Sequence, residues 1–198
     1  QFGYTLYLST GLLAWTFLST AVTKGVAVFG SNAGWIRGTP APFTVLALRN
    51  LYSLWLETVL VGLAVVPMIA INGIPTVPHM AMIVAAIMVY SAFAVAAALL
   101  FGCIGAWSSD FQQLVPAMMR IAFFATPIFW DYKAGGGRRL LLAQYNPFAH
   151  LVEILRAPLM NISPSSTNWI VSLGTTLGLV CVALIVFKHA RPRLASWV

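Results

Sequence analysis

The sequence predicts an all-α membrane protein: a polytopic helical bundle that forms one transmembrane domain over residues 1–198. Three observations predict this fold class. Hydrophobic residues make up 60% of the chain, whereas charged residues make up only 8%, and four residues in all are acidic. A typical soluble domain carries about 25% charged residues. The hydrophobic residues also gather in long blocks, each close to or longer than the ~20 residues that cross ~30 Å of hydrocarbon as a helix.

Five blocks of this kind follow one another, and we expect each to form a span. They cover about residues 2–23, 45–71, 79–107, 111–130 and 168–187. Strands are disfavoured, because a membrane β-barrel alternates apolar and polar residues and the third block is continuously apolar from Ala81 to Val89. The chain starts close to its first block without the basic region of a signal peptide, so we expect its natural start to lie further upstream.

Lysine and arginine positions predict the orientation of the spans. With a cytoplasmic C-terminal tail, six of these residues lie on the inner side and four on the outer side. The inner residues are Lys24, Arg37, Arg49, Lys188, Arg191 and Arg193, and the outer residues are Lys133, Arg138, Arg139 and Arg156. This modest bias follows the positive-inside rule. The net charge of +7 favours contact with membrane lipids, and no nucleic-acid partner is expected.

The loop between the first two blocks, residues 24–42, is rich in glycine and proline. Within it, Ser31 or Asn32 can cap a short helix that ends near Gly38. The loop is either a solvated connector with Trp35 at the membrane interface, or a docking element against which a cytoplasmic partner pushes. The sequence leaves both interpretations open.

Two charged residues lie inside the expected spans. Glu57 falls near the middle of the second block, where a carboxylate is costly unless it is paired or neutral, so it marks a candidate functional site. Arg120 in the fourth block lies at a comparable depth, which suggests a Glu57–Arg120 contact. The alternative is a protonated Glu57 that faces a water-filled cavity or another residue.

Small residues recur every four positions in two of the blocks. They are Ala94, Ala98 and Gly102 in the third block, and Gly174 and Gly178 in the last. Small side chains at this spacing let helices approach closely. We expect these residues to serve packing within the bundle in preference to a seam between two copies.

The fourth block holds two prolines, Pro116 and Pro127, which are expected to kink its helix. Aromatic side chains crowd its outer half, namely Phe123, Phe124, Phe129 and Trp130. They form either a belt at the membrane interface or the lining of a conduit on which sugar rings stack.

The segment of residues 131–165 is too polar for a full span and too apolar for an ordinary loop. Asn146 followed by Pro147 is a strong helix start. An apolar stripe then follows at helical spacing, made of Phe148, Leu151, Val152, Leu155 and Leu159. Two short helices that flank Asn146 and Pro147 therefore suggest a re-entrant hairpin in the outer leaflet.

Three polar residues lie beside this stripe, three positions apart: His150, Glu153 and Arg156. A metal site built on His150 and Glu153 is disfavoured, because two ligands are too few. An ion pair between Glu153 and Arg156, one helical turn apart, is the better interpretation.

Four motifs occur in an order that is typical of one family. They are the polar loop from Ser31 to Arg37, the turn from Ser109 to Leu114, the span end from Thr126 to Trp130, and the segment from Tyr145 to Glu153. Together they resemble the permease subunit of type-2 ABC exporters, most of all the branch that exports lipid-linked O-antigen, capsule or teichoic acid. The resemblance covers essentially the whole chain, and the last motif is the most specific.

This resemblance implies a homodimer of six-span permeases in the bacterial cytoplasmic (inner) membrane, so that one span would be missing here. Two copies of a separate ATPase subunit would bind ATP and Mg and power the export of the glycan. We therefore expect no cofactor in this chain and no enzymatic activity of its own. The sequence contains no P-loop motif, which agrees with energy supplied by a partner. The alternatives are a permease for a drug or a simple lipid, and a membrane-embedded enzyme acting on a lipid carrier, which the scattered carboxylates disfavour.

The resemblance also assigns roles to particular residues. Docking on the ATPase would involve Ser31, Asn32, Trp35, Ile36 and Arg37. The outer gate would involve Tyr145, Asn146, Pro147, Phe148, His150, Glu153 and Arg156. The glycan would pass the aromatic side chains Tyr4, Tyr7, Phe123, Phe124, Phe129 and Trp130.

Overall fold

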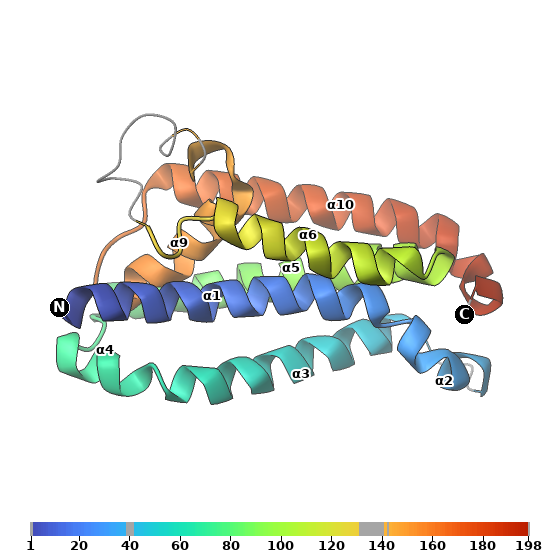
Figure 1. Cartoon of the computed structure of the whole chain (residues 1–198), viewed down its shortest axis with the longest axis horizontal. Coiled ribbons are helices and arrows are strands. Elements are labelled where there is room, and N and C mark those ends of the chain that lie inside the picture. The colour runs from blue at the N-terminus through green and yellow to red at the C-terminus, as the bar shows by residue number, and fades with distance from the viewer. Residues whose placement is uncertain (1, 39–41, 131–140, 142, 198) are drawn as a thin grey trace.

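The computed structural model describes residues 2–38, 42–130, 141 and 143–197, and it contains no strand within them. The helices are α1 (Phe2–Ala27), the 3-10 turn η1 (Gly30–Asn32), α2 (Ala33–Gly38), α3 (Thr44–Leu63), α4 (Val66–Asn72), α5 (Val77–Trp107), α6 (Asp110–Ala125), α9 (Pro147–Leu159) and α10 (Ser166–Trp197). Figure 1 shows the long helices running side by side along one axis. The N-terminus, α4 and α9 lie at one end of the bundle, and α2 and the C-terminus lie at the other.

Among the described residues, four helices are long and apolar enough to cross a membrane. They are Gly3–Ala27, Thr44–Leu63, Val77–Trp107 and Ser166–Leu194. These helices confirm the predicted all-α, multi-pass membrane fold.

The fourth block differs from the expected span of residues 111–130. Its helix, α6, has 16 residues, about 24 Å of helix at 1.5 Å per residue, and a non-helical stretch follows from Thr126 to Trp130. Thr126 adopts φ −95° and ψ 136°, the extended conformation that a residue before proline favours. Pro127 therefore ends the helix early.

The second block, expected as one span over residues 45–71, forms two helices. The first, α3, ends at Leu63 and the second, α4, begins at Val66. Pro67 lies in the first turn of α4, where its missing N–H needs no partner and where it prevents α3 from continuing. Gly73, at φ 112°, then turns the chain towards α5.

Helices α1 and α5 form the centre of the bundle and approach each other closely. A methyl group placed on Gly25 would lie 3.2 Å from the Cα atom of Ala98, and one placed on Gly105 would lie 2.0 Å from the carbonyl oxygen of Val26. Ala94 is buried in the same region. The packing role predicted for the small residues of the third block is therefore confirmed.

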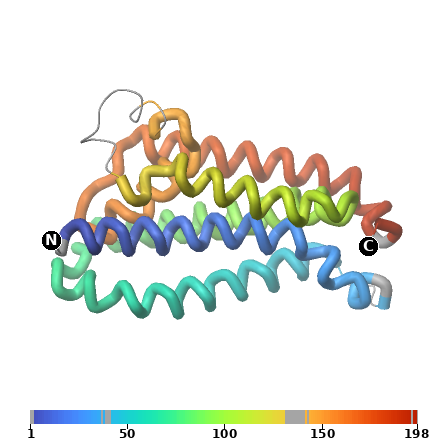
Figure 2. Tube along the Cα trace, viewed as in Figure 1, coloured from blue at the N-terminus to red at the C-terminus, as the bar shows by residue number. Residues whose placement is uncertain are grey.

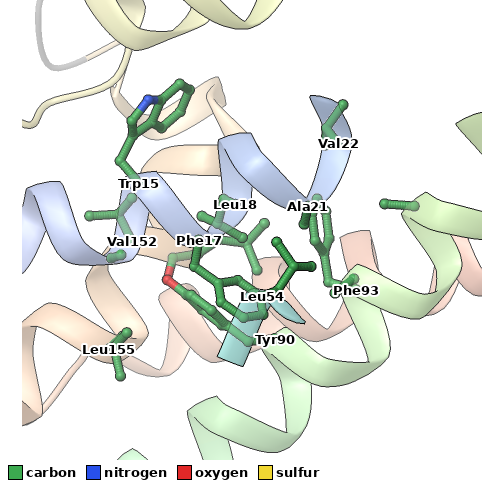
Figure 3. Close-up of a cluster of buried hydrophobic side chains, with 14 of the residues drawn as sticks. Trp15, Phe17, Leu18, Ala21, Val22, Leu54, Tyr90, Phe93, Val152 and Leu155 are labelled. Carbon is green, nitrogen blue, oxygen red and sulfur yellow. The ribbon is translucent and has the colours of Figure 1, made fainter. Parts of the chain in front are cut away.

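Larger apolar side chains fill the space around this contact. Figure 3 shows side chains of α1 against those of α3, α5 and α9 in one cluster. Its labelled members are Trp15, Phe17, Leu18, Ala21, Val22, Leu54, Tyr90, Phe93, Val152 and Leu155. The short helix α9 is thus part of the main core, although it does not span the bundle.

The small residues of the last block have a different environment, and the packing role predicted for them is wrong. A methyl group placed on Gly174 or Gly178 of α10 would meet none of the described residues within 4 Å. These glycines instead line an apolar cavity of about 500 Å³, to which Phe93 of α5 and Met119 of α6 also contribute.

Candidate functional site

Helix α9 runs from the middle of the bundle to the end that holds the N-terminus and α4 (Figure 1). The ring of Phe148, in the first turn of α9, lies 5.6 Å from that of Trp15 and 6.4 Å from that of Phe93. At 1.5 Å per residue, Trp15 lies about 20 Å from the N-terminal end of α1, and Phe93 lies about 24 Å from the N-terminal end of α5. Beyond the other end of α9, Asn161 accepts a hydrogen bond of 2.9 Å from the backbone N–H of Thr76, just before α5. This course agrees with the expected re-entrant hairpin, which stays a prediction, because residues 138–140 and 142 of its other arm lie outside the described residues.

One side chain, Asn146, joins the ends of two helices. Its Oδ1 accepts a hydrogen bond of 3.0 Å from the N–H of Phe148, which caps α9 as predicted. Its Nδ2 donates to the carbonyl oxygen of Ala125 at 3.1 Å and to Oγ1 of Thr126 at 3.0 Å. The same amide therefore satisfies the C-terminal end of α6, which Pro127 leaves without helical partners.

Replacing Asn146 with alanine is expected to lower the free energy of unfolding by about 2 kcal/mol. Loss of an N-cap costs about 1 kcal/mol, and the loss of the bonds to α6 adds a similar amount. Asn146→Asp keeps a capping oxygen but places a second oxygen against the Ala125 carbonyl, so it should not restore stability. Thermal unfolding in detergent measures both variants, with the exposed Asn72→Ala as the control expected to stay within about 0.5 kcal/mol. Full rescue by aspartate would mean that only the cap matters.

A buried ion pair on α9 connects three elements. Arg156 is 1% exposed and Glu153 is 9% exposed. Nε of Arg156 donates to Oε2 of Glu153 at 2.9 Å, and Nη2 bonds the same oxygen. Nη1 donates to the carbonyl oxygen of Pro127 at 2.9 Å, and the guanidinium carbon lies 3.9 Å from the centre of the Tyr7 ring. The predicted Glu153–Arg156 pair is confirmed, and it also ties α9 to α1 and to the end of α6.

Two tyrosines of α1 serve the same non-helical stretch after α6. The hydroxyl of Tyr4 donates to the carbonyl oxygen of Phe129 at 3.0 Å, and that of Tyr7 donates to those of Pro127 at 3.3 Å and Trp130 at 3.4 Å. Irregular backbone within a membrane needs such partners, because no water is present in hydrocarbon to satisfy its carbonyl groups. Tyr4 and Tyr7 thus hold this stretch in place, whereas their role in lining the glycan path stays a prediction.

The aromatic side chains at the end of α6 divide into an inner and an outer set. Phe123 packs inwards against Trp15, with ring centres 5.7 Å apart. Phe124 and Phe129 are 74% and 41% exposed, and both contact the ring of Phe123. The exposed pair is therefore placed where it can meet a molecule that passes along the outside of this bundle. That role stays a prediction.

His150 links α9 to α10. It is buried, its Nδ1 lies 2.8 Å from Oδ1 of Asn168 on α10, and its Nε2 donates to the carbonyl oxygen of Gln144 at 2.9 Å. Both ring nitrogens are thus occupied by structural contacts. Within the described part of the chain, no three His, Cys, Asp or Glu residues are grouped as metal ligands would be. Tyr145, next to the cap, is by contrast 84% exposed.

The predicted contact between Glu57 and Arg120 is wrong. Glu57 forms an ion pair with Lys24 of α1, and both side chains are about half exposed. Arg120 is exposed and makes no ion pair with any residue that the structure describes. Figure 1 shows the reason: α3 and α6 lie on opposite sides of α1, so similar depth does not bring their side chains together.

The predicted docking segment is attached to the bundle by its apolar side. Ile36 is buried in a second core cluster with Phe29 and Leu46, and Trp35 packs half-buried against it. Ser31 is exposed at the turn before α2. Asn32 donates to the carbonyl oxygen of Val28 at 2.8 Å, which stiffens the junction with α1. The side chain of Arg37 lies outside the described residues.

Hydroxyl side chains along the exposed side of α1 form a polar track that hydropathy does not reveal. Its exposed or half-exposed members are Ser9, Thr16, Thr20 and Thr23. Some of these hydroxyls donate to the carbonyl four residues earlier, as Ser9 does to Thr5 at 2.7 Å and Thr23 to Ser19 at 2.9 Å. Their spacing of three, four and seven residues on one helical face is the signal that could have found them.

Comparison with known proteins gives an independent result. No family model matches the chain. Two proteins of Klebsiella pneumoniae, each named O-antigen export system permease protein RfbA, are 23% identical to it over 194 residues. These residues are 98% of this chain and 75% of each relative. The chain is similar to O-antigen export permeases. The resemblance inferred from the four motifs is thereby confirmed, and the similarity includes both the α2 region and α9.

Proposed function

We propose that this chain is the membrane-spanning permease subunit of an ABC exporter that moves a lipid-linked polysaccharide across the bacterial cytoplasmic membrane. Two copies of the chain would form the conduit, and two copies of a separate ATPase subunit would bind ATP and Mg and supply the energy. The observation that carries the proposal is the similarity to O-antigen export permeases over 98% of the chain. A bundle of apolar helices in the membrane is the fold that such a role requires.

Features at both ends of the bundle support the proposal. At the inner end, Ile36 is anchored in a cluster with residues of α3, α5 and α10, so force applied to α2 would act on three long helices. At the outer end, α9 forms a lid that is joined to α1, α5, α6 and α10. Exposed aromatic rings, such as those of Phe124 and Phe129, are suited to stack on the C–H faces of sugars.

The apolar cavity between α5, α6 and α10 favours one alternative, a permease for a drug or a simple lipid. Its lining, which includes Phe101, Met118 and Leu179, would accept a hydrocarbon or an aromatic molecule. An export assay separates the two functions. Cells that lack their own O-antigen permease and carry this one with its ATPase should display the glycan on their surface, whereas a drug permease would leave it inside.

Docking through α2 predicts that Trp35→Ala uncouples the transporter. The rate of glycan-stimulated ATP hydrolysis by the co-purified complex should fall at least about tenfold. An aromatic anchor in a docking interface typically contributes 2 kcal/mol or more of binding free energy. ATP turnover in nanodiscs measures the effect. Trp107→Ala, an exposed tryptophan at the same end of the bundle, is the matched control and should keep the activity. Unchanged turnover in Trp35→Ala would contradict the docking role of α2.

A further inference from the structure

A polar cavity of about 360 Å³ lies at the inner end of the bundle, apart from the outer gate and its aromatic residues. It is an open cavity lined by the last turns of α1, by η1 and by the first turns of α3, which lie together at that end of Figure 2. Its polar lining consists of Lys24, Ser31, Asn32, Arg49, Asn50 and Ser53. Its volume falls within the ~300–1,000 Å³ of small-molecule sites.

The charges at this cavity favour an anion. Lys24 and Arg49 both line it, and Glu57, one turn beyond Ser53, is already paired with Lys24. In the part of the chain that the structure describes, the guanidinium of Arg49 makes no ion pair. One positive charge therefore remains uncompensated at the cavity. Arginine matches the oxygen geometry of a phosphate with two parallel hydrogen bonds.

A second observation points to a missing acceptor. Nδ2 of Asn50 is buried and has no hydrogen-bond partner among the described residues. Buried donors without partners are rare in folded proteins and require an explanation. The hydroxyls of Ser31 and Ser53 line the same cavity and can also donate. An oxygen-rich anion in the cavity would accept from these hydroxyls and compensate the charge of Arg49. A rotation of the Asn50 amide towards the cavity would give its unpartnered donor the same acceptor.

We propose that this cavity binds the phosphate or diphosphate head group of a membrane lipid. It lies where the predicted orientation places the cytoplasmic membrane surface, and basic pockets between spans on that side hold anionic lipid head groups. Identification of the occupant as a lipid-linked diphosphate rests on the proposed function. Ser31 and Asn32 belong to the predicted docking segment, so an occupied cavity would contact the element that receives force from the ATPase.

The test is equilibrium binding of radiolabelled farnesyl diphosphate to the permease in phosphatidylcholine nanodiscs. Arg49→Gln should weaken binding at least tenfold, and Arg49→Lys, which keeps the charge without the paired donors, should weaken it less. Arg193→Gln removes an exposed positive charge at the same end but outside the cavity, so it should bind as the unaltered permease does. Helix content and elution volume show that each variant is folded.

Competition identifies the source of the head group. Displacement by phosphatidylglycerol at similar concentrations would assign the site to a phospholipid, and resistance to it would assign the site to a prenyl diphosphate. Either result supports the proposal if Arg49→Gln weakens the binding. Equal displacement by inorganic diphosphate would overturn the lipid assignment, and equal loss in Arg49→Gln and Arg193→Gln would overturn the site. Because the assay contains neither ATPase nor glycan, failure of the proposed export function would not change its outcome.

Discussion

Gly105→Ala is expected to break the contact between α1 and α5 and to lower the free energy of unfolding by about 3 kcal/mol, the upper end for overpacked sites. The added Cβ would lie 2.0 Å from the carbonyl oxygen of Val26 and 2.9 Å from its Cγ2. A backbone oxygen cannot rotate away as a side chain can. The whole of α1 would therefore have to shift from α5, which would open the main core. Thermal unfolding in detergent, followed by helix content, measures the loss.

Gly178→Ala is the matched control for this variant. Both glycines lie inside long helices, but a methyl group on Gly178 would meet no atom of the described part of the chain within 4 Å. Alanine is favoured over glycine in a helix by about 1 kcal/mol, so this change should be neutral or slightly stabilising. If both variants unfold at the temperature of the unaltered protein, α1 and α5 are not in contact at Gly105 in the way described.

Features with local or length-dependent causes could be predicted from the sequence. Because hydrocarbon offers no hydrogen-bond partners, a span must be a helix, and that helix must be long and apolar to cross it. Long apolar blocks in the sequence therefore predict the spans directly. The cap at Asn146 and the pair between Glu153 and Arg156 involve residues two and three positions apart. Their geometry is fixed by the helix itself and needs no knowledge of the fold.

Contacts between distant elements could not be predicted in this way. Glu57 and Arg120 lie at similar depth, but depth does not say which helices are neighbours, and Lys24 is the actual partner of Glu57. The repeat of Gly174 and Gly178 has the same spacing as that of the third block, yet among the described residues it faces a cavity and makes no close helix contact. Spacing shows which residues share a face, whereas the occupant of that face depends on the arrangement of the whole bundle.

Arg156→Met is expected to destabilise the bundle by about 3–5 kcal/mol, because it removes one partner of a buried ion pair and leaves the other charge uncompensated. Glu153 would keep its carboxylate in the core, and the carbonyl oxygen of Pro127 would lose its donor. Methionine fills much of the volume of arginine, so the loss reflects charge more than cavity formation. Unfolding in detergent measures it, and the amount of folded protein recovered from membranes should fall in parallel.

The double variant Glu153→Gln, Arg156→Met separates the two contributions. If the cost comes from the unpaired carboxylate, neutralising Glu153 should recover most of the stability lost in Arg156→Met. What is not recovered reports the bonds that Arg156 makes beyond its own helix, to the Pro127 carbonyl and the Tyr7 ring. The stability of Arg156→Lys should lie between that of Arg156→Met and that of the unaltered protein. One ammonium keeps the charge but cannot bond the carboxylate and the carbonyl with the geometry of a guanidinium. A stability of Arg156→Met equal to that of the unaltered protein would mean that α9 is held by apolar packing alone.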